Sequence, residues 1–247
     1  MRISPDSVIV GEIFGLEVPM TIAGSWAVIA PLAAASFLIT RRFSPDFKMS
    51  RVQNATESAV IFLRNQIEET LERPADKYIP FVGSMFIFIL ASNWSAILPV
   101  PFKTDEGWEM MAPATASLST TAALAIMVML STIWFGIRAR GWRGYFAKFF
   151  KPVFAMLPLN LMIEISGGLA LAVRLYGNIM SGAVLGAIVF MLAPLVFPAV
   201  LSIYGLLAGT IQPYIFLVLS LVYIGSAMGA PTKAERESLE QLKERRT

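Results

Sequence analysis

Residues 152–192 read PVFAMLPLNLMIEISGGLALAVRLYGNIMSGAVLGAIVFML, and a second apolar stretch follows at residues 199–229. A helix needs about 20 apolar residues to cross the hydrocarbon core of a bilayer. Both stretches are longer than that, so they predict two long transmembrane helices that are tilted, curved or broken. Within them the only charged residues are Glu164 and Arg174.

The composition of the whole chain indicates an all-α polytopic membrane protein. Hydrophobic residues make up 56% of its 247 residues, and the mean hydropathy is +0.65. The absence of Cys excludes disulfides, thiol nucleophiles and iron–sulfur clusters, and the absence of His removes the commonest haem and zinc ligand. We therefore expect no cofactor and no metal. The N-terminus lacks the pattern of a cleaved signal peptide, so we expect it to be retained.

Shorter apolar stretches predict three further spans, which brings the total to about five transmembrane helices. Residues 54–73 instead predict an interfacial amphipathic helix, because Ala59, Leu63, Ile67 and Leu71 share one face. We expect a single membrane domain over residues 1–247. Its segments are an external N-terminal segment (1–21), a first span (22–40), the interfacial helix (54–73), a hairpin of two spans (79–98 and 114–137), a long hairpin (152–192 and 199–229) and a cytoplasmic tail (233–247).

Basic residues predict the orientation of these spans. They gather after the first span, after the third span and in the tail, whereas the loop between the second and third spans is acidic. Short loops rich in Lys and Arg stay in the cytoplasm. We therefore expect an external N-terminus and a cytoplasmic C-terminus, and we expect the net charge of +3 to reflect this topology rather than nucleic-acid binding.

Arg174 is the residue that most needs an explanation. Helical spacing places it on one face with Gly167, Leu171, Asn178, Ser181 and Leu185. An arginine keeps its charge even inside a membrane, where an uncompensated charge is costly. Glu164 lies ten residues away, about 15 Å along a helix, which is too far for contact. Either Asn, Ser and backbone carbonyls compensate Arg174 structurally, or a carboxylate of another chain does, and we favour the second interpretation.

Several motifs resemble those of subunit a, the membrane-embedded subunit of rotary F-type ATP synthases. They extend over most of the chain, from about residue 54 to residue 229, and their order and spacing are more specific than any one of them. The motifs are IPFVGSMFIFILASNWSAILP (79–99), PATASLSTTAALA (113–125), LPLNLMIE (157–164), LAVRLYGN (171–178) and IQPYIFLVLSLVYIGSAM (211–228).

The resemblance implies that Arg174 faces a ring of c subunits, each of which carries one carboxylate near the bilayer centre. The chain would then be a non-catalytic stator subunit that forms two half-channels for protons or sodium ions, while ATP chemistry occurs on partner subunits. The implied partners are the c ring, b-type subunits of the peripheral stalk, the rest of the F-type ATP synthase and the lipid bilayer, with no nucleic acid. The implied location is a bacterial inner membrane.

The same resemblance implies which side chains line the path. It places Asn178 and Gln212 beside Arg174. Where many relatives carry ionisable residues, this chain has Ala183, Gly205 and Ser117. The remaining candidates are mostly neutral oxygens and amides, namely Asn160, Ser117, Ser119, Thr120, Thr121, Ser166, Ser181, Tyr204 and Thr210, together with Glu164. Neutral oxygens also suit alkali cations, so proton and sodium coupling both remain open.

Two other classes of protein compete with this interpretation. A stand-alone secondary transporter would use Arg174 to bind an anionic substrate and would need no ring. A respiratory anchor for haem or quinone is weaker, because the chain has no His. There is also no GxxxxGK[ST] motif for a nucleotide.

Overall fold

The computed structural model describes residues 9–13, 16–41, 51–95, 101–104, 107–110, 114–150, 157–192 and 197–229. Six α-helices dominate this part of the chain, which confirms the predicted all-α polytopic membrane fold. They are α1 (Met20–Arg41), α2 (Arg51–Leu71), α3 (Ile79–Ser95), α4 (Leu118–Phe149), α5 (Leu157–Leu192) and α6 (Phe197–Met228).

Within the described residues, four helices are long and apolar enough to cross a membrane. These stretches are Ile22–Arg41, Leu118–Phe149, Leu157–Gly182 and Ile203–Met228. The apolar helix α3 is shorter, with 17 residues. The predicted span 79–98 includes α3, and its last three residues lie outside the described part of the chain, as do the tail 233–247 and residues 1–8.

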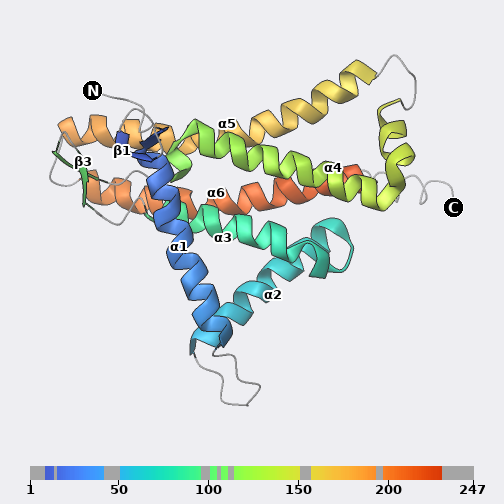
Figure 1. The fold of residues 1–247 in the computed structure, drawn as a ribbon, viewed down its shortest axis with the longest axis horizontal. Helices are drawn as coiled ribbons and strands as arrows, with labels where there is room; N and C mark the ends of the chain where they lie inside the picture. Colours follow the sequence, from blue (N-terminus) through green and yellow to red (C-terminus); the bar gives the residue numbers. More distant parts are fainter. Residues whose placement is uncertain are drawn as a thin grey trace.

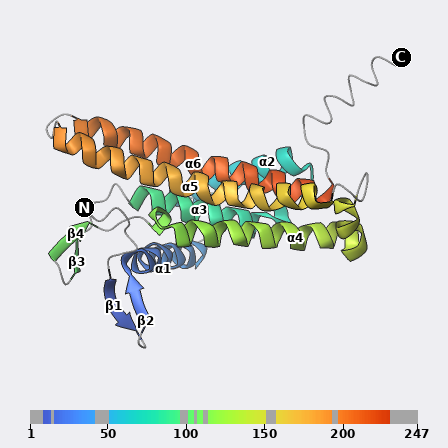
Figure 2. The same cartoon turned by 90° about the horizontal axis from the view of Figure 1, so that it is seen from above.

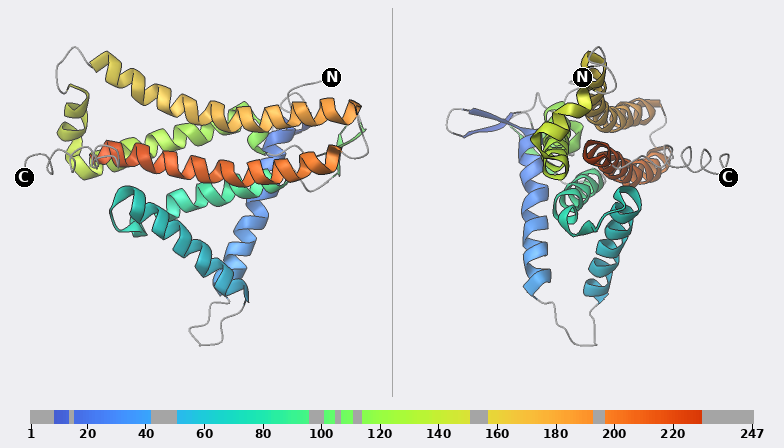
Figure 3. Two further views of the ribbon diagram at one scale, coloured as in Figure 1. Left: turned by 180° about the vertical axis from the view of Figure 1, so that it is seen from behind. Right: turned by 90° about the vertical axis from the view of Figure 1, so that its right-hand side faces the viewer.

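The helices form a layer that one helix crosses. α3, α4, α5 and α6 run side by side, whereas α1 crosses them steeply and α2 returns from its far end (Figure 1). Figure 2 shows the same layer from above, with α5 and α6 extending beyond the start of α4. The second view in Figure 3 shows that α1 and α2 project from the other helices and are separated from each other.

The apolar face of α2 packs against protein. Leu63, Ile67 and Leu71 are buried in one cluster with residues of α3 and α6, including Val82 and Leu221. Their spacing of four residues keeps them on one side of the helix. Ala59, which we expected on the same face, is exposed, because the contacts of α2 with α6 and α3 lie toward its C-terminal half.

α4 differs from the sequence prediction at its C-terminal end. The sequence predicts a loop after residue 137, yet the helix runs on through the basic segment to Phe149. It kinks at Gly141, whose φ of 74° lies in the left-handed region that glycine adopts without strain. The segment after the kink, residues 142–149, therefore turns toward the start of α5 (Figure 1).

Two short antiparallel hairpins, which the sequence analysis did not predict, interrupt the helical pattern. The first pairs β1 (Ile9–Ile13) with β2 (Leu16–Pro19), and the second pairs β3 (Pro101–Thr104) with β4 (Gly107–Met110). Both belong to segments that connect or precede helices, and both lie at the same end of the molecule (Figure 2). They leave the helical layer itself unchanged.

Close packing around Gly136 gives a first prediction. A Cβ at this position would lie 2.7 Å from the Tyr145 ring and 3.1 Å from the Cβ of Ala227. We expect Gly136→Ala to lower the free energy of unfolding by about 1–3 kcal/mol through overpacking, measured by denaturant titration in detergent. Gly205→Ala is the control, since nothing lies within 4 Å of its new Cβ. Equal stability of the two variants would contradict this packing.

Candidate functional site

Arg174 is exposed on α5 and has no partner in the described part of the chain. No hydrogen bond or ion pair to its guanidinium is found among those residues. The face predicted for α5 is only partly covered: Leu171 is 2% exposed, whereas Leu185 is 49% exposed. The reason is that α5 extends beyond the start of α4, so its C-terminal half loses that neighbour (Figure 2).

One turn after Arg174, a side-chain hydrogen bond joins the two long helices. The Nδ2 of Asn178 on α5 donates to the Oε1 of Gln212 on α6 at 2.5 Å. Gln212 is 3% exposed, so its amide is held inside the protein. On the same face of α5, the hydroxyl of Ser181 donates to the backbone oxygen of Asn178 at 3.1 Å. This hydrogen bond therefore holds the Asn178 face of α5 against α6.

A buried polar network lies beside this pair and was missed by the sequence analysis. The hydroxyl of Thr115 donates to the Oδ1 of Asn93 at 2.8 Å, and the backbone N–H of Thr115 donates to the Ser92 hydroxyl at 3.2 Å. Thr115 lies in the short helix η3 (Ala114–Ala116), and it and Ser92 are both fully buried. The network therefore ties the end of α3 to the segment that enters α4.

Asn93 also reaches α6, where a proline has freed a carbonyl. Pro213 lies inside α6 and has no N–H, so the carbonyl four residues earlier, that of Gly209, loses its helical partner. The Nδ2 of Asn93 donates to this Gly209 oxygen at 3.0 Å. A Cβ on Gly209 would lie 3.3 Å from the Cβ of Asn93, so the glycine permits the close approach. The sequence signal for this contact was the proline directly after Gln212.

The predicted candidates at the start of α4 differ in their environments. Ser117 precedes the helix and is fully buried, and its carbonyl accepts hydrogen bonds from the backbone N–H and the hydroxyl of Thr121. Thr120 is half-buried and Ser119 is exposed. These hydroxyls adjoin the network of Asn93 and Thr115, since η3 leads directly into α4.

Glu164 and Asn160 lie at the other end of α5, away from Arg174. Glu164 forms an ion pair with Lys148 at 2.9 Å and accepts a hydrogen bond from the Tyr145 hydroxyl at 3.4 Å. The Nδ2 of Asn160 donates to the Phe149 backbone oxygen at 3.1 Å. Both side chains therefore attach the start of α5 to the segment of α4 that follows its kink.

The structure thus separates the predicted site residues into three groups. Arg174, Asn178, Ser181 and Gln212 form the middle group, Ser117 and Thr120 belong with the start of α4, and Glu164 and Asn160 belong with its end. Among the positions that depart from the relatives, Gly205 is exposed with nothing near it, and the side chain of Ala183 lies outside the described part.

These features define an integral membrane protein of the all-α polytopic class, with polar side chains gathered where α5 and α6 meet. The chain belongs to the ATP synthase A chain family, which it matches over residues 22–225. It is 42% identical over 227 residues to ATP synthase subunit a of Albidiferax ferrireducens, covering 92% of this chain and 94% of the relative.

Two further relatives are similar to a comparable degree. ATP synthase subunit a 1 of Chlorobium luteolum is 42% identical over 237 residues, which cover 96% of this chain and 100% of the relative. ATP synthase subunit a 2 of Acaryochloris marina is 39% identical over 227 residues, covering 92% and 93% of the two chains. The resemblance found in the sequence motifs is therefore confirmed at the level of the family.

Proposed function

We propose that this chain is the stator subunit a of a rotary F-type ATP synthase and that Arg174 is the fixed charge that acts on the carboxylates of a c ring. The observation that carries the proposal is the exposure of Arg174 without a partner in the described residues, next to a turn of α5 held by Asn178 and Gln212. Family membership argues against the alternative of a stand-alone transporter that binds an anionic substrate.

The chemistry of the proposed role requires an arginine. A carboxylate that turns through lipid is neutral, because it carries a proton or a bound cation, since an ionised one is costly there. Opposite Arg174 the ionised form becomes favourable, so the ion leaves. Lysine loses its proton when buried, whereas arginine keeps its charge and offers five donors. The fixed charge also blocks direct leakage of cations between the two sides.

The three groups of polar side chains support two separate half-channels. Ser117 and Thr120 lie near the start of α4, whereas Glu164 and Asn160 lie near its end, and Arg174 lies between the two groups along α5. In the proposed path, each outer group lines access from one side of the membrane to the ring. The bond between Asn178 and Gln212 positions Arg174 by holding α5 against α6.

The orientation we propose has the N-terminus outside and the C-terminus in the cytoplasm of a bacterial inner membrane. The ends of α4 and α6 lie at one end of the molecule, whereas the two hairpins lie at the opposite end (Figure 1). This grouping supports the predicted topology, with b-type stalk subunits as further partners. It also follows the distribution of the basic residues.

The topology is testable because the chain has no native cysteine. Glu68 is exposed on α2, so Glu68→Cys introduces a single accessible thiol. We expect an impermeant thiol reagent to label it in inside-out vesicles and not in intact spheroplasts. As a control, Glu109→Cys, in the loop expected outside, shows the opposite pattern. Labelling of Glu68→Cys from outside would overturn the orientation.

The coupling ion is tested by carbodiimide modification of the ring carboxylate in the assembled complex at fixed pH. If sodium is the coupling ion, sodium protects the carboxylate and ATP-driven transport requires it. If protons are the coupling ion, neither effect occurs near neutral pH. Full labelling in high sodium would exclude the sodium hypothesis.

Glu164→Gln is the companion variant in this experiment. Glu164 forms an ion pair with Lys148. Unchanged transport in Glu164→Gln would therefore assign Glu164 a structural role at the end of the helix.

A further inference from the structure

A cavity of about 450 Å³ lies between the second half of α4 and the first half of α5. These two helices diverge, and the segment of α4 after Gly141 spans the gap between them (Figure 1). The volume falls within the roughly 300–1,000 Å³ of sites that bind lipophilic molecules. Neither Arg174 nor Gln212 lines this cavity, and of the residues assigned to the proposed ion path only Glu164 lies in its wall.

The cavity opens toward lipid. Its inner wall consists of buried side chains, such as Val128 and Leu171, at 1% and 2% exposure. Its mouth consists of exposed apolar ones, with Ile133 at 37% and Ile165 at 52%. Ile165 precedes Arg174 by nine residues, two and a half helical turns, and so points to the opposite side of α5. The mouth therefore faces away from the proposed ring contact, and hydrocarbon fills such a space more favourably than water.

One polar atom in the wall indicates more than a plain hydrocarbon. Thr132 lines the cavity and is 4% exposed, and its Oγ1 has no hydrogen-bond partner among the residues that the structure describes. A buried hydroxyl without a partner is unfavourable, which calls for an acceptor that enters from outside the chain. Glu164 is the charged residue in the wall. Its carboxylate is already paired with Lys148 and accepts a hydrogen bond from Tyr145. An acyl ester carbonyl provides both the acceptor for Thr132 and the chain that fills the cavity.

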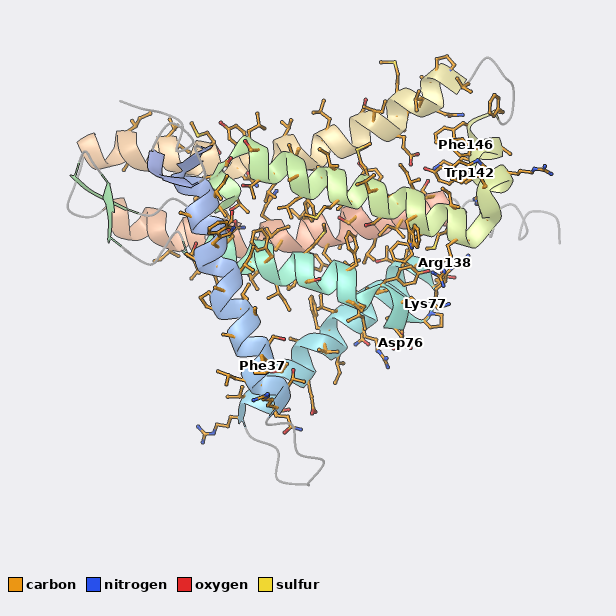
Figure 4. The ribbon with its side chains drawn as sticks, viewed as in Figure 1. Phe37, Asp76, Lys77, Arg138, Trp142 and Phe146 are labelled. Atoms are coloured by element: carbon orange, nitrogen blue, oxygen red, sulfur yellow. The ribbon has the colours of Figure 1, made fainter. Side chains whose placement is uncertain are left out.

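The end of α4 beside the cavity is positively charged. Arg138, Arg140 and Arg143 are exposed, and no ion pair to them is found in the described part of the chain. Trp142 and Phe146 lie on the same segment (Figure 4), and their rings are 5.2 Å apart. Aromatic and basic side chains together are typical of the headgroup level of a membrane, where clustered arginines attract anionic lipids.

We propose that this cavity binds an anionic phospholipid of the surrounding bilayer. One acyl chain fills the space between α4 and α5, and its ester carbonyl accepts the hydrogen bond of Thr132. The phosphate lies toward Arg143, on the segment of α4 after the kink, whose Phe146 and Phe149 line the cavity. The bound lipid thereby supports the kinked end of α4 against the start of α5.

The test uses the purified assembled complex in phosphatidylcholine vesicles that contain a photoreactive phosphatidylglycerol with a diazirine in one acyl chain. We expect the crosslinked peptides to come mainly from the lining segments of α4 and α5. Ile133→Trp blocks the mouth and lowers this labelling about tenfold, because the indole excludes several methylene groups. The matched control is Ile126→Trp, an exposed isoleucine two turns earlier on α4 that does not line the cavity, and its labelling stays within about twofold of wild type.

Two further arms separate the polar contacts from the apolar fit. Thr132→Val keeps the shape of the side chain and removes the hydroxyl, so labelling by the ester-linked probe falls about fivefold while labelling by a diether analogue is unchanged. The variant Arg143→Gln makes a phosphatidylcholine probe label as well as the phosphatidylglycerol probe. Labelling spread evenly over the helices, crosslinks to a partner subunit at the cavity, or equal labelling by both headgroups in wild type would overturn the proposal.

Discussion

We expect replacement of Arg174 with Ala to abolish coupled ion transport while the chain remains inserted and assembled. Without Arg174 an ionised ring carboxylate would bear the uncompensated cost of an intramembrane charge, about 2.5–3.5 kcal/mol on insertion scales, and 1.4 kcal/mol corresponds to a factor of ten. We therefore expect ATP-driven transport in vesicles to fall by about 100-fold or more. We expect Arg174→Lys to fail or nearly fail as well, because a lysine readily loses its proton in apolar surroundings, whereas an arginine keeps its charge.

The structure also predicts that the loss is one of function and not of folding. Arg174 makes no contact that holds the described residues together, since its side chain is exposed and without a hydrogen bond or ion pair there. Arg51→Ala, at an exposed arginine of α2, is the control for assembly and should transport normally. Wild-type rates of transport in Arg174→Ala would remove the central proposal.

Asn93→Leu is expected to destabilise the chain strongly. It leaves the Gly209 carbonyl without a donor, because Pro213 cannot supply one, and it removes the acceptor of the Thr115 hydroxyl. Each buried polar group left unpaired costs about 1–3 kcal/mol. The free energy of unfolding in detergent, measured by denaturant titration, should fall by roughly 2–6 kcal/mol on this basis.

The control for this measurement is Asn65→Leu, an exposed asparagine of α2. Surface substitutions of this kind stay within about 0.5 kcal/mol of wild type. If Asn93→Leu were no less stable than Asn65→Leu, the buried network would not contribute to stability. Thr115→Val removes a single hydroxyl, so we expect it to lower the free energy of unfolding by less than Asn93→Leu does. The difference between the two variants would separate the contribution of this hydroxyl from that of the Gly209 contact.

The apolar pattern predicted the helices of this fold well, because each long run has to form helix in a bilayer, where backbone groups find no water. The end of α4 was not predictable in the same way. The basic segment from Arg138 resembles a loop in composition, and only the left-handed conformation of Gly141 allows the helix to turn and resume. The two hairpins were missed because they lie in short connecting segments without an apolar run.

The sequence singled out Arg174 by its charge, and its role stays a prediction. Asn178 and Gln212, which the family resemblance places beside it, form a hydrogen bond with each other in the structure. Asn93, Ser92 and Thr115 were missed, since a hydroxyl in an apolar helix usually bonds to its own backbone. Their partners lie more than 20 residues away in the chain, so only the folded arrangement brings them together.

The sparse packing of α1 has a consequence for how the protein is made. Val28 is the one buried large apolar side chain among its described residues, and its neighbours include α3 and η3, which leave the ribosome later. α1 also has the highest mean hydropathy of the four candidate spans. During synthesis α1 is therefore able to enter the bilayer as a solitary helix, without the helices it later contacts, until α3 emerges.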